Sequence, residues 1–92
     1  MYTIQYHPLV VRDDIPKLDA AYRQRIKRSI EQKLTIDPET FGIPLRRSLK
    51  GYRKLRVGDY RIVIRIVDKA VYILAIMHRS IVYEHISKRV GQ

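Results

Sequence analysis

Cationic side chains recur at alternating positions between residues 54 and 83, in the stretch KLRVGDYRIVIRIVDKAVYILAIMHRSIVY. We predict three strands here, joined by two-residue turns at Gly58-Asp59 and Asp68-Lys69. Because side chains alternate between the faces of a strand, turns of this length gather cations on one face. That face carries Lys54, Arg56, Arg61 and His78, and just past its edge lie Arg79 and Tyr83. Crowded cations repel one another, so we expect an anion among them, and we favour an RNA phosphate.

The predicted register decides which side chains meet. The first hairpin sets Arg56 opposite Arg61, and Arg65 lies farther along the same face. In the second hairpin, the predicted rungs are Ile76 opposite Arg61, Leu74 opposite Val63 and Tyr72 opposite Arg65. The other face is predicted to be the core, formed by Leu55, Val57, Tyr60, Ile62, Ile64, Val71, Ile73, Ala75 and Met77. Opposed like charges destabilise a sheet by up to ~1 kcal/mol, which favours a functional face over a solvated face without function. A one-residue slip in either turn would reverse these faces.

The charge of the chain is concentrated in its second half. Residues 1–41 hold seven basic and six acidic side chains, whereas residues 42–92 hold twelve basic and three acidic ones, for a net charge of +10. Such asymmetry indicates nucleic acid, an acidic partner or anionic lipid, against the plainer alternative of a basic soluble domain. Lipid is disfavoured because the cations lie on predicted strands and not on an amphipathic helix.

The length of 92 residues predicts one domain, covering residues 1–92. The absence of cysteine excludes disulfides and cysteine-ligated metal sites. No signal peptide and no membrane span is predicted, because the N-terminus lacks a basic start with an apolar run and the longest apolar stretch is a strand.

Hydrophobic periodicity and breakers place the remaining elements. Asp19 is a plausible N-cap for a helix over residues 20–34, whose apolar stripe is Tyr22, Ile26, Ile30 and Leu34. The other predicted elements are a strand over 2–7, a short helix or turn over 9–18, a loop over 35–47, strands over 52–57, 60–67 and 70–78, and a terminal helix over 81–90.

Three short motifs stand in order along these elements: Leu49-Lys50-Gly51, the run RVGDYR over residues 56–61, and His78-Arg79 followed by Tyr83. In this order the chain resembles, over nearly its whole length, the RelE/ParE superfamily of prokaryotic toxins from toxin–antitoxin pairs. The resemblance implies an α+β fold: a small antiparallel sheet of about four strands, with N-terminal helices packed on one face.

The RelE branch of that superfamily is a ribosome-dependent endoribonuclease that cleaves messenger RNA without a metal and is blocked by an antitoxin. The resemblance therefore implies messenger RNA, the ribosome and a cognate antitoxin as partners, no cofactor or metal, no membrane, and the cytoplasm of a prokaryote. The family pattern falls here on Arg61, Arg79 and Tyr83 as catalytic residues, with His78 similar to the histidine of other branches. The residues expected to bind RNA phosphates are Lys50, Lys54, Arg56 and Arg65. Several RelE toxins carry two lysines where this chain has Lys54 and Arg56, and the spacing from Arg79 to Tyr83 is shorter than in some members.

Metal-free cleavage of RNA proceeds by attack of a ribose 2′-oxygen on the adjacent phosphate. Arg61 and Arg56 suit stabilisation of the phosphate charge, because a guanidinium grips two oxygens at once. Tyr83 and His78 are alternative candidates for the base, since nearby cations favour a phenolate and histidine titrates near neutrality. Arg79 is a candidate for the leaving group. The plainer interpretation makes Tyr83 a core or cap residue and Arg79 a solvated strand end.

Two other functions remain open. A ParE-like toxin shares the fold, inhibits DNA gyrase without being an enzyme, and generally lacks the basic-plus-tyrosine site. A plain nucleic-acid-binding module would rely on charge alone and would bind with a steep salt dependence and no cleavage.

Overall fold

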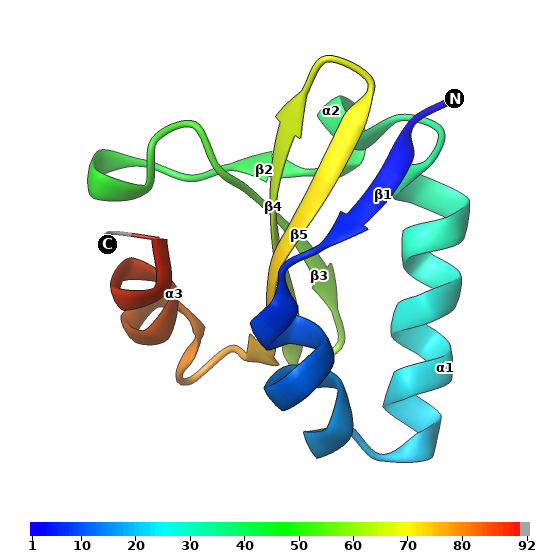
Figure 1. Ribbon diagram of the computed structural model, residues 1–92, viewed down its shortest axis with the longest axis vertical. Helices are drawn as coiled ribbons and strands as arrows, with labels where there is room; N and C mark the ends of the chain where they lie inside the picture. The colour runs from blue at the N-terminus through cyan, green and yellow to red at the C-terminus, as the bar shows by residue number, and fades with distance from the viewer. Residues whose placement is uncertain (91–92) are drawn as a thin grey trace.

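A computed structural model describes residues 1–90 of the chain. A five-stranded sheet of order β1-β5-β4-β3-β2 lies between helices on its two sides (Figure 1). Its elements are β1 (Thr3–Tyr6), η1 (Val10–Asp14), η2 (Ile15–Lys17), α1 (Ala20–Ser29), η3 (Ile30–Leu34), α2 (Pro38–Phe41), β2 (Ile43–Pro44), η4 (Arg47–Leu49), β3 (Arg53–Val57), β4 (Tyr60–Val67), β5 (Ala70–His78) and α3 (Val82–Val90). Within residues 1–90 no helix combines the length and apolar content that crossing a membrane requires.

The predicted α+β class is confirmed, and the sheet differs from the prediction in two respects. It has five strands, because Ile43 and Pro44 of the predicted loop pair with Lys54 and Arg53 as β2. It is mixed, because β1 runs parallel to β5. A strand of two residues leaves too short a pattern to be recognised in the sequence.

The long N-terminal helix begins where the sequence predicts. The Asp19 side chain accepts a hydrogen bond of 2.8 Å from the Tyr22 backbone N–H and so caps α1. The helical path continues through η3 to Leu34, which matches the predicted range of 20–34. Ile26, Ile30 and Leu34 are all buried on the stripe that faces the sheet.

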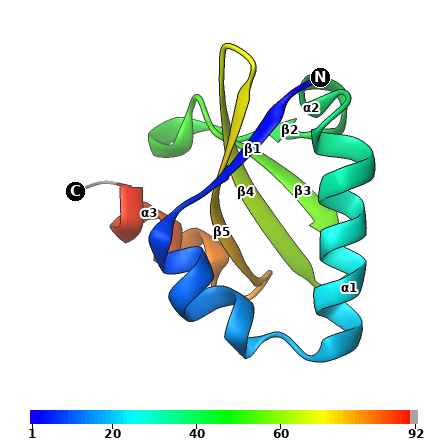
Figure 2. The same cartoon turned by 45° about the vertical axis from the view of Figure 1, so that its right-hand side comes forward.

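The first hairpin has the predicted register. Arg56 pairs with Arg61, and Val57 pairs with Tyr60, across a turn in which Gly58 has a φ of +58°. The positive φ explains why glycine stands at this position. The Tyr22 hydroxyl accepts a hydrogen bond of 3.2 Å from the Asp59 N–H, so this turn reaches α1 (Figure 2).

The second hairpin keeps the predicted register only up to a bulge at Leu74. The predicted rung between Tyr72 and Arg65 is present, but Ile64 pairs with Ile73 while the next residue, Val63, pairs with Ala75. The extra residue shifts every later rung by one. The predicted pairs of Leu74 with Val63 and of Ile76 with Arg61 are therefore wrong: Met77 pairs with Arg61, Ile76 with Ile62, and His78 with Tyr60.

The bulge divides the buried side chains of β5 between two cores. On the α1 side the larger core contains Leu55, Val57, Ile62, Ile64, Val71, Ile73 and Ile76 together with the apolar stripe of α1 and η3. On the α3 side a smaller core contains Leu49, Val63, Ala75, Met77, Val82 and Ile86. Ala75 and Met77 were predicted to join the first core and lie in the second, because the bulge reverses their side of the strand. The N-terminal helices do cover one face, as predicted, and α3 covers the other.

Candidate functional site

The α3 side of the sheet carries the opposed arginines that the sequence predicts. Arg56 and Arg61 form a rung of the first hairpin, so their side chains leave the same face. Arg56 is exposed, whereas Arg61 is only 7% exposed. The ion pairs of residues 1–90 join other side chains, and neither arginine takes part in them. Two positive charges therefore stand side by side, and within residues 1–90 no carboxylate forms an ion pair with either of them.

The Arg61 side chain is folded back onto the turn that precedes it. Its Nη1 donates hydrogen bonds of 2.9 Å to the carbonyl oxygens of Gly58 and Tyr60. Two carbonyl acceptors compensate part of the cost of burying a guanidinium. Because Nη1 uses both of its hydrogens in this way, Nε and Nη2 are, among the described contacts, the nitrogens left for a ligand.

Lys54 and Tyr83 meet at the start of α3. The Lys54 Nζ donates a hydrogen bond of 3.1 Å to the Tyr83 hydroxyl oxygen and lies 5.5 Å from the centre of its ring. Lys54 is on the same face of β3 as Arg56, two residues away. The side chain of Val82, the residue before Tyr83, is fully buried in the smaller core. Packing of the first turn of α3 therefore holds a phenol beside an ammonium group. This contact lies at the margin of the cationic face, by which we mean the α3-side surface of β3 and β4 that carries Lys54, Arg56 and Arg61.

His78 lies on the other face of the sheet, contrary to the prediction. Its ring packs edge-on against Tyr60, with the two ring centres 5.7 Å apart, on the α1 side. Nδ1 accepts a hydrogen bond of 3.2 Å from the Ser80 N–H and lies 2.8 Å from the Ser80 hydroxyl. In the neutral ring this arrangement leaves the proton on Nε2. The reason for the wrong prediction is the bulge at Leu74, which moves His78 across the sheet.

Arg79 follows His78 and lies beside the Gly58-Asp59 turn, at the end of the cationic face nearest that turn. Its backbone N–H donates a hydrogen bond of 2.8 Å to the Asp59 carbonyl, which extends the ladder between β4 and β5. Its Nε is 3.8 Å from the Asp59 carboxylate, and both side chains are largely exposed. Exposed pairs at this distance contribute little, so the guanidinium is available to an anion that approaches the turn.

Arg65 and Lys50 lie at the far end of the sheet. Arg65 is four residues along β4 from Arg61, a separation of roughly 13 Å in a strand. Its guanidinium carbon lies 5.8 Å from the centre of the Tyr52 ring. The structure thus brings Lys54, Arg56, Arg61, Arg79 and Tyr83 to one region and leaves Arg65 and Lys50 in another.

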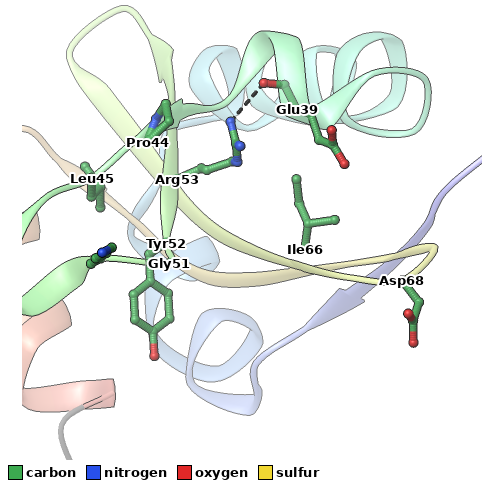
Figure 3. Close-up of a pocket in the computed structure, with 9 residues that line it drawn as sticks. Glu39, Pro44, Leu45, Gly51, Tyr52, Arg53, Ile66 and Asp68 are labelled. Atoms are coloured by element: carbon green, nitrogen blue, oxygen red, sulfur yellow. Dashed lines mark hydrogen bonds between the residues drawn. The ribbon is translucent and has the colours of Figure 1, made fainter.

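Lys50 lines an open pocket of about 640 Å³ that was not predicted (Figure 3). Arg53 also lines this pocket, and its Nη1 donates hydrogen bonds of 2.9 Å to the carbonyls of Glu39 and Gly42. Glu39 and Asp68 also line it, so carboxylates stand beside the cations. The mixed charge makes this pocket a poorer phosphate site than the face around Arg56 and Arg61.

A buried ion pair between Asp14 and Arg89 was also missed by the sequence analysis. Its shortest contact joins Arg89 Nη1 and Asp14 Oδ2 at 2.8 Å, and both side chains are almost fully buried. A signal existed, because Arg89 continues the apolar stripe of Val82 and Ile86 on the same face of α3. An arginine on the buried face of a helix requires a partner, and no such partner is adjacent in sequence.

Three ionisable groups near the N-terminus, those of Tyr6, Arg12 and Asp13, have shifted pKa values. The hydrogen bond from Arg12 lowers the pKa of the Asp13 carboxyl, and the same bond raises the pKa of Arg12. Burial, with help from the charge of Glu31, raises the pKa of the Tyr6 phenol. Within residues 1–90 no cluster of His, Asp or Glu is arranged to hold a metal ion.

Comparison with known proteins gives a consistent family. Residues 4–83 match the model of the ParE toxin of the type II toxin–antitoxin system, parDE. Toxin RelG of Mycobacterium tuberculosis is 33% identical over 84 residues, which cover 89% of this chain and 95% of that relative. The toxin–antitoxin complex RelBE2 of the same organism contains a chain 34% identical, with a TM-score of 0.78 over 85% of this chain and 98% of that one.

The isolated RelE toxin of E. coli has the same fold at lower identity. It superposes with a TM-score of 0.70 over 98% of this chain and 99% of that one, at 22% identity. The family model covers most of the chain, and the relative at 33% identity covers nearly all of it. The chain therefore belongs to the RelE/ParE superfamily of toxins from type II toxin–antitoxin systems.

Proposed function

We propose that the protein is a ribosome-dependent endoribonuclease that cleaves messenger RNA without a metal. The observation that carries the proposal is the contact between Lys54 and Tyr83. It lies next to Arg56 and Arg61, which oppose each other across β3 and β4 and form no ion pair within residues 1–90. A phenol held by an ammonium group beside two guanidinium groups supplies a proton acceptor and a phosphate-binding surface in one place.

In this mechanism the scissile phosphate binds across Arg56 and Lys54. Arg56 is exposed and makes the first contact, while the buried guanidinium of Arg61 behind it supplies positive charge that does not have to reorganise. Water is largely excluded from Arg61, so its interaction with the developing phosphorane is screened less than that of an exposed arginine.

Tyr83 is the base that takes the 2′ proton in this proposal, and Arg79 assists the leaving 5′-oxygen. The position of His78 on the opposite face favours Tyr83 over His78. A positioned general base contributes a factor of about 10²–10⁴ to the rate. Arg65 lies roughly 13 Å from Arg61 along β4, and Lys50 lines the open pocket; in this proposal both bind neighbouring RNA or ribosomal phosphates.

The proposed partners follow from the family and from the charge. A cognate antitoxin neutralises the toxin in the prokaryotic cytoplasm, as the toxin–antitoxin complexes among the related structures suggest. The net charge of +10 favours an acidic segment in that antitoxin and favours ribosomal RNA as the surface on which the toxin acts.

The proposal is tested by mapping cut sites on translated messages after induction of the toxin. Tyr83→Phe removes the proton acceptor but keeps the ring, so it should abolish cleavage while the protein stays folded. His78→Ala is the matched control and should retain cleavage, because His78 lies on the other face. Loss of cleavage in His78→Ala together with retention in Tyr83→Phe would reverse the roles.

A ParE-like gyrase inhibitor is the second candidate, and the match to the ParE family model favours it. That function needs no proton acceptor and predicts intact transcripts together with an induced DNA-damage response. Growth arrest that survives Tyr83→Phe, with messages uncut, would select this alternative.

A further inference from the structure

The Asp14–Arg89 pair joins three elements that are far apart in sequence. Arg89 Nη1 and Nη2 donate to the two carboxylate oxygens of Asp14, at 2.8 Å and 3.2 Å. The same Nη1 also donates to the Leu74 carbonyl at 2.9 Å, and Asp14 Oδ2 accepts the Ile76 N–H at 3.0 Å. The pair therefore connects η1 and α3 to the bulge residue Leu74 and to Ile76, two residues beyond it in β5.

The position of the pair explains why these backbone groups need it. β1 ends at Tyr6, which pairs with Ile73, so the backbone of Leu74 and Ile76 extends beyond the neighbouring strand. Buried backbone groups at such an edge must find other partners. Asp14 accepts the hydrogen bond of the Ile76 N–H, and Arg89 donates one to the Leu74 carbonyl. The opposite charges of the two side chains compensate each other.

Apolar packing alone does not fix the rotation of α3. Val82 and Ile86 insert into the smaller core, but apolar contacts are not directional and permit a helix to roll or tilt. Tyr83 lies at the first turn of α3 and Arg89 lies six residues later, about 9 Å along the helix axis. The bidentate ion pair of Arg89 with Asp14, near the C-terminal end of α3, fixes the rotation of the helix about its axis. It thereby also fixes the direction in which the Tyr83 side chain projects from the first turn.

We propose that Asp14 and Arg89 are positioning residues for Tyr83: their buried pair sets the orientation of α3 and thereby holds the phenol against Lys54. The proposal depends on the proposed function only in treating Tyr83 as a group of the reaction. The geometric part, that the pair places the phenol, can be measured without any substrate.

The principal variant is the double substitution Asp14→Asn with Arg89→Met in the full chain. It removes both charges together, because removing one partner would leave the other buried and unpaired. The measurement is the nuclear Overhauser cross-peak between the Tyr83 ring and the Lys54 side chain. We expect this cross-peak to weaken several-fold, while cross-peaks between Ile62 and Ile76 across β4 and β5 keep their intensity.

Steady-state cleavage of RNA on ribosomes provides the second measurement. A misplaced base lowers the rate of the chemical step without changing the affinity for RNA, so we expect kcat to fall roughly tenfold to a hundredfold at unchanged KM. A merely stabilising pair would lower the melting temperature and leave both the cross-peak and kcat of the folded protein unchanged. That result would overturn the proposal.

A matched control lies next to the pair in sequence. Arg12 and Asp13 form an ion pair of 2.9 Å on the surface of η1, with side chains 73% and 37% exposed. Asp13→Asn should leave the cross-peak and kcat unchanged, as should Lys88→Met beside Arg89. An equal effect of Asp13→Asn would mean that any charge change near η1 suffices, and the proposal would fail.

A second variant decides the question if the double substitution does not fold. Arg89→Lys keeps the charge but cannot form two parallel hydrogen bonds, so it should weaken the cross-peak partially. An unchanged cross-peak in Arg89→Lys would overturn the proposal. If the wild-type protein proves inactive as a nuclease, the cross-peak still decides the positioning role, so failure of the proposed function is distinguished from failure of this inference.

Discussion

The two faces of the sheet differ in what covers them and in how the covering is held. The α1 face buries a continuous apolar core that runs from Leu55 on β3 to Val71 and Ile73 on β5. The α3 face buries a smaller core, surrounded by cations, and its helix is fastened by a buried ion pair. Nearly all the charged residues proposed to act on RNA lie on this second face.

The difference indicates a division of labour between stability and binding. Opposed arginines cost a sheet up to ~1 kcal/mol, and that cost falls on the face with the smaller core. The apolar burial of the α1 face, at ~25 cal/mol for each Å² removed from water, offsets it. A face that is not needed to hold the fold together can carry like charges for a ligand.

The largest expected effect comes from inserting one alanine between Ala75 and Ile76. The added residue shifts the end of β5 by one position, so Ile76 moves to the α3 face, opposite Arg61, and Met77 moves to the α1 face, opposite Tyr60. Both cores would lose buried side chains, at a cost comparable to the ~5–15 kcal/mol that stabilises a whole domain. We expect an unfolded chain by circular dichroism.

Deletion of Leu74 is the control for this insertion. It removes the extra residue but keeps Ala75 opposite Val63 and Ile76 opposite Ile62, so both cores keep their side chains and the protein should fold. An insertion variant that still unfolds cooperatively would show that the register of β5 does not determine the two faces.

Replacing one buried isoleucine by alanine on each face compares how much each core contributes to stability. Ile64 and Ile86 are both fully buried, one in each core. Ile64→Ala should cost about 2–5 kcal/mol, at the upper end of that range, because the centre of the sheet cannot relax. Ile86→Ala should fall at the lower end, because a single terminal helix can shift to fill the space. Urea denaturation measures both, and equal costs would contradict the division of labour.

The first hairpin could be predicted because its sequence alternates. In residues 54–57 and 60–62 basic and apolar side chains alternate, and Gly58-Asp59 marks the turn, so register and faces follow. The placement of Lys54, Arg56 and Arg61 on one face is confirmed for this reason. The N-cap at Asp19 could be predicted on equally local grounds.

The second hairpin could not be predicted in full because β5 is apolar on both faces. Between Ala70 and Met77 nearly every side chain is apolar, so no alternation reveals where the extra residue lies. The bulge follows from the tertiary structure, in which Arg89 binds the carbonyl of the extra residue, Leu74, and Asp14 binds the N–H of Ile76 beyond it. The wrong face for His78 is the consequence.

The two arginines of the opposed rung provide a finer comparison within the cationic face. Arg61→Ala leaves the carbonyls of Gly58 and Tyr60 without their donor, so it should cost about 1–3 kcal/mol in stability. Arg56→Ala removes an exposed side chain and should change stability by less than ~0.5 kcal/mol. Both should reduce RNA cleavage, and only Arg56→Ala should do so at unchanged stability.

Urea denaturation and cleavage on ribosomes, measured on the same samples, test this pair. A loss of stability in Arg56→Ala equal to that in Arg61→Ala would mean that burial does not distinguish their roles. Full cleavage by Arg56→Ala would remove it from the phosphate-binding surface.

The smallest expected effect concerns the contact that ties the turn to α1. Tyr22→Phe removes the hydroxyl that accepts the Asp59 N–H, a partly exposed hydrogen bond worth at most about 1 kcal/mol. The turn carries Gly58, whose carbonyl binds Arg61, so its loosening should also raise the hydrogen-exchange rate of the Asp59 amide. Tyr60→Phe is the control, since its hydroxyl forms no hydrogen bond with the described residues and its ring stays packed on Tyr22. If both variants exchange alike, the α1 face stabilises the turn by packing alone, and the hydrogen bond does not link the two faces.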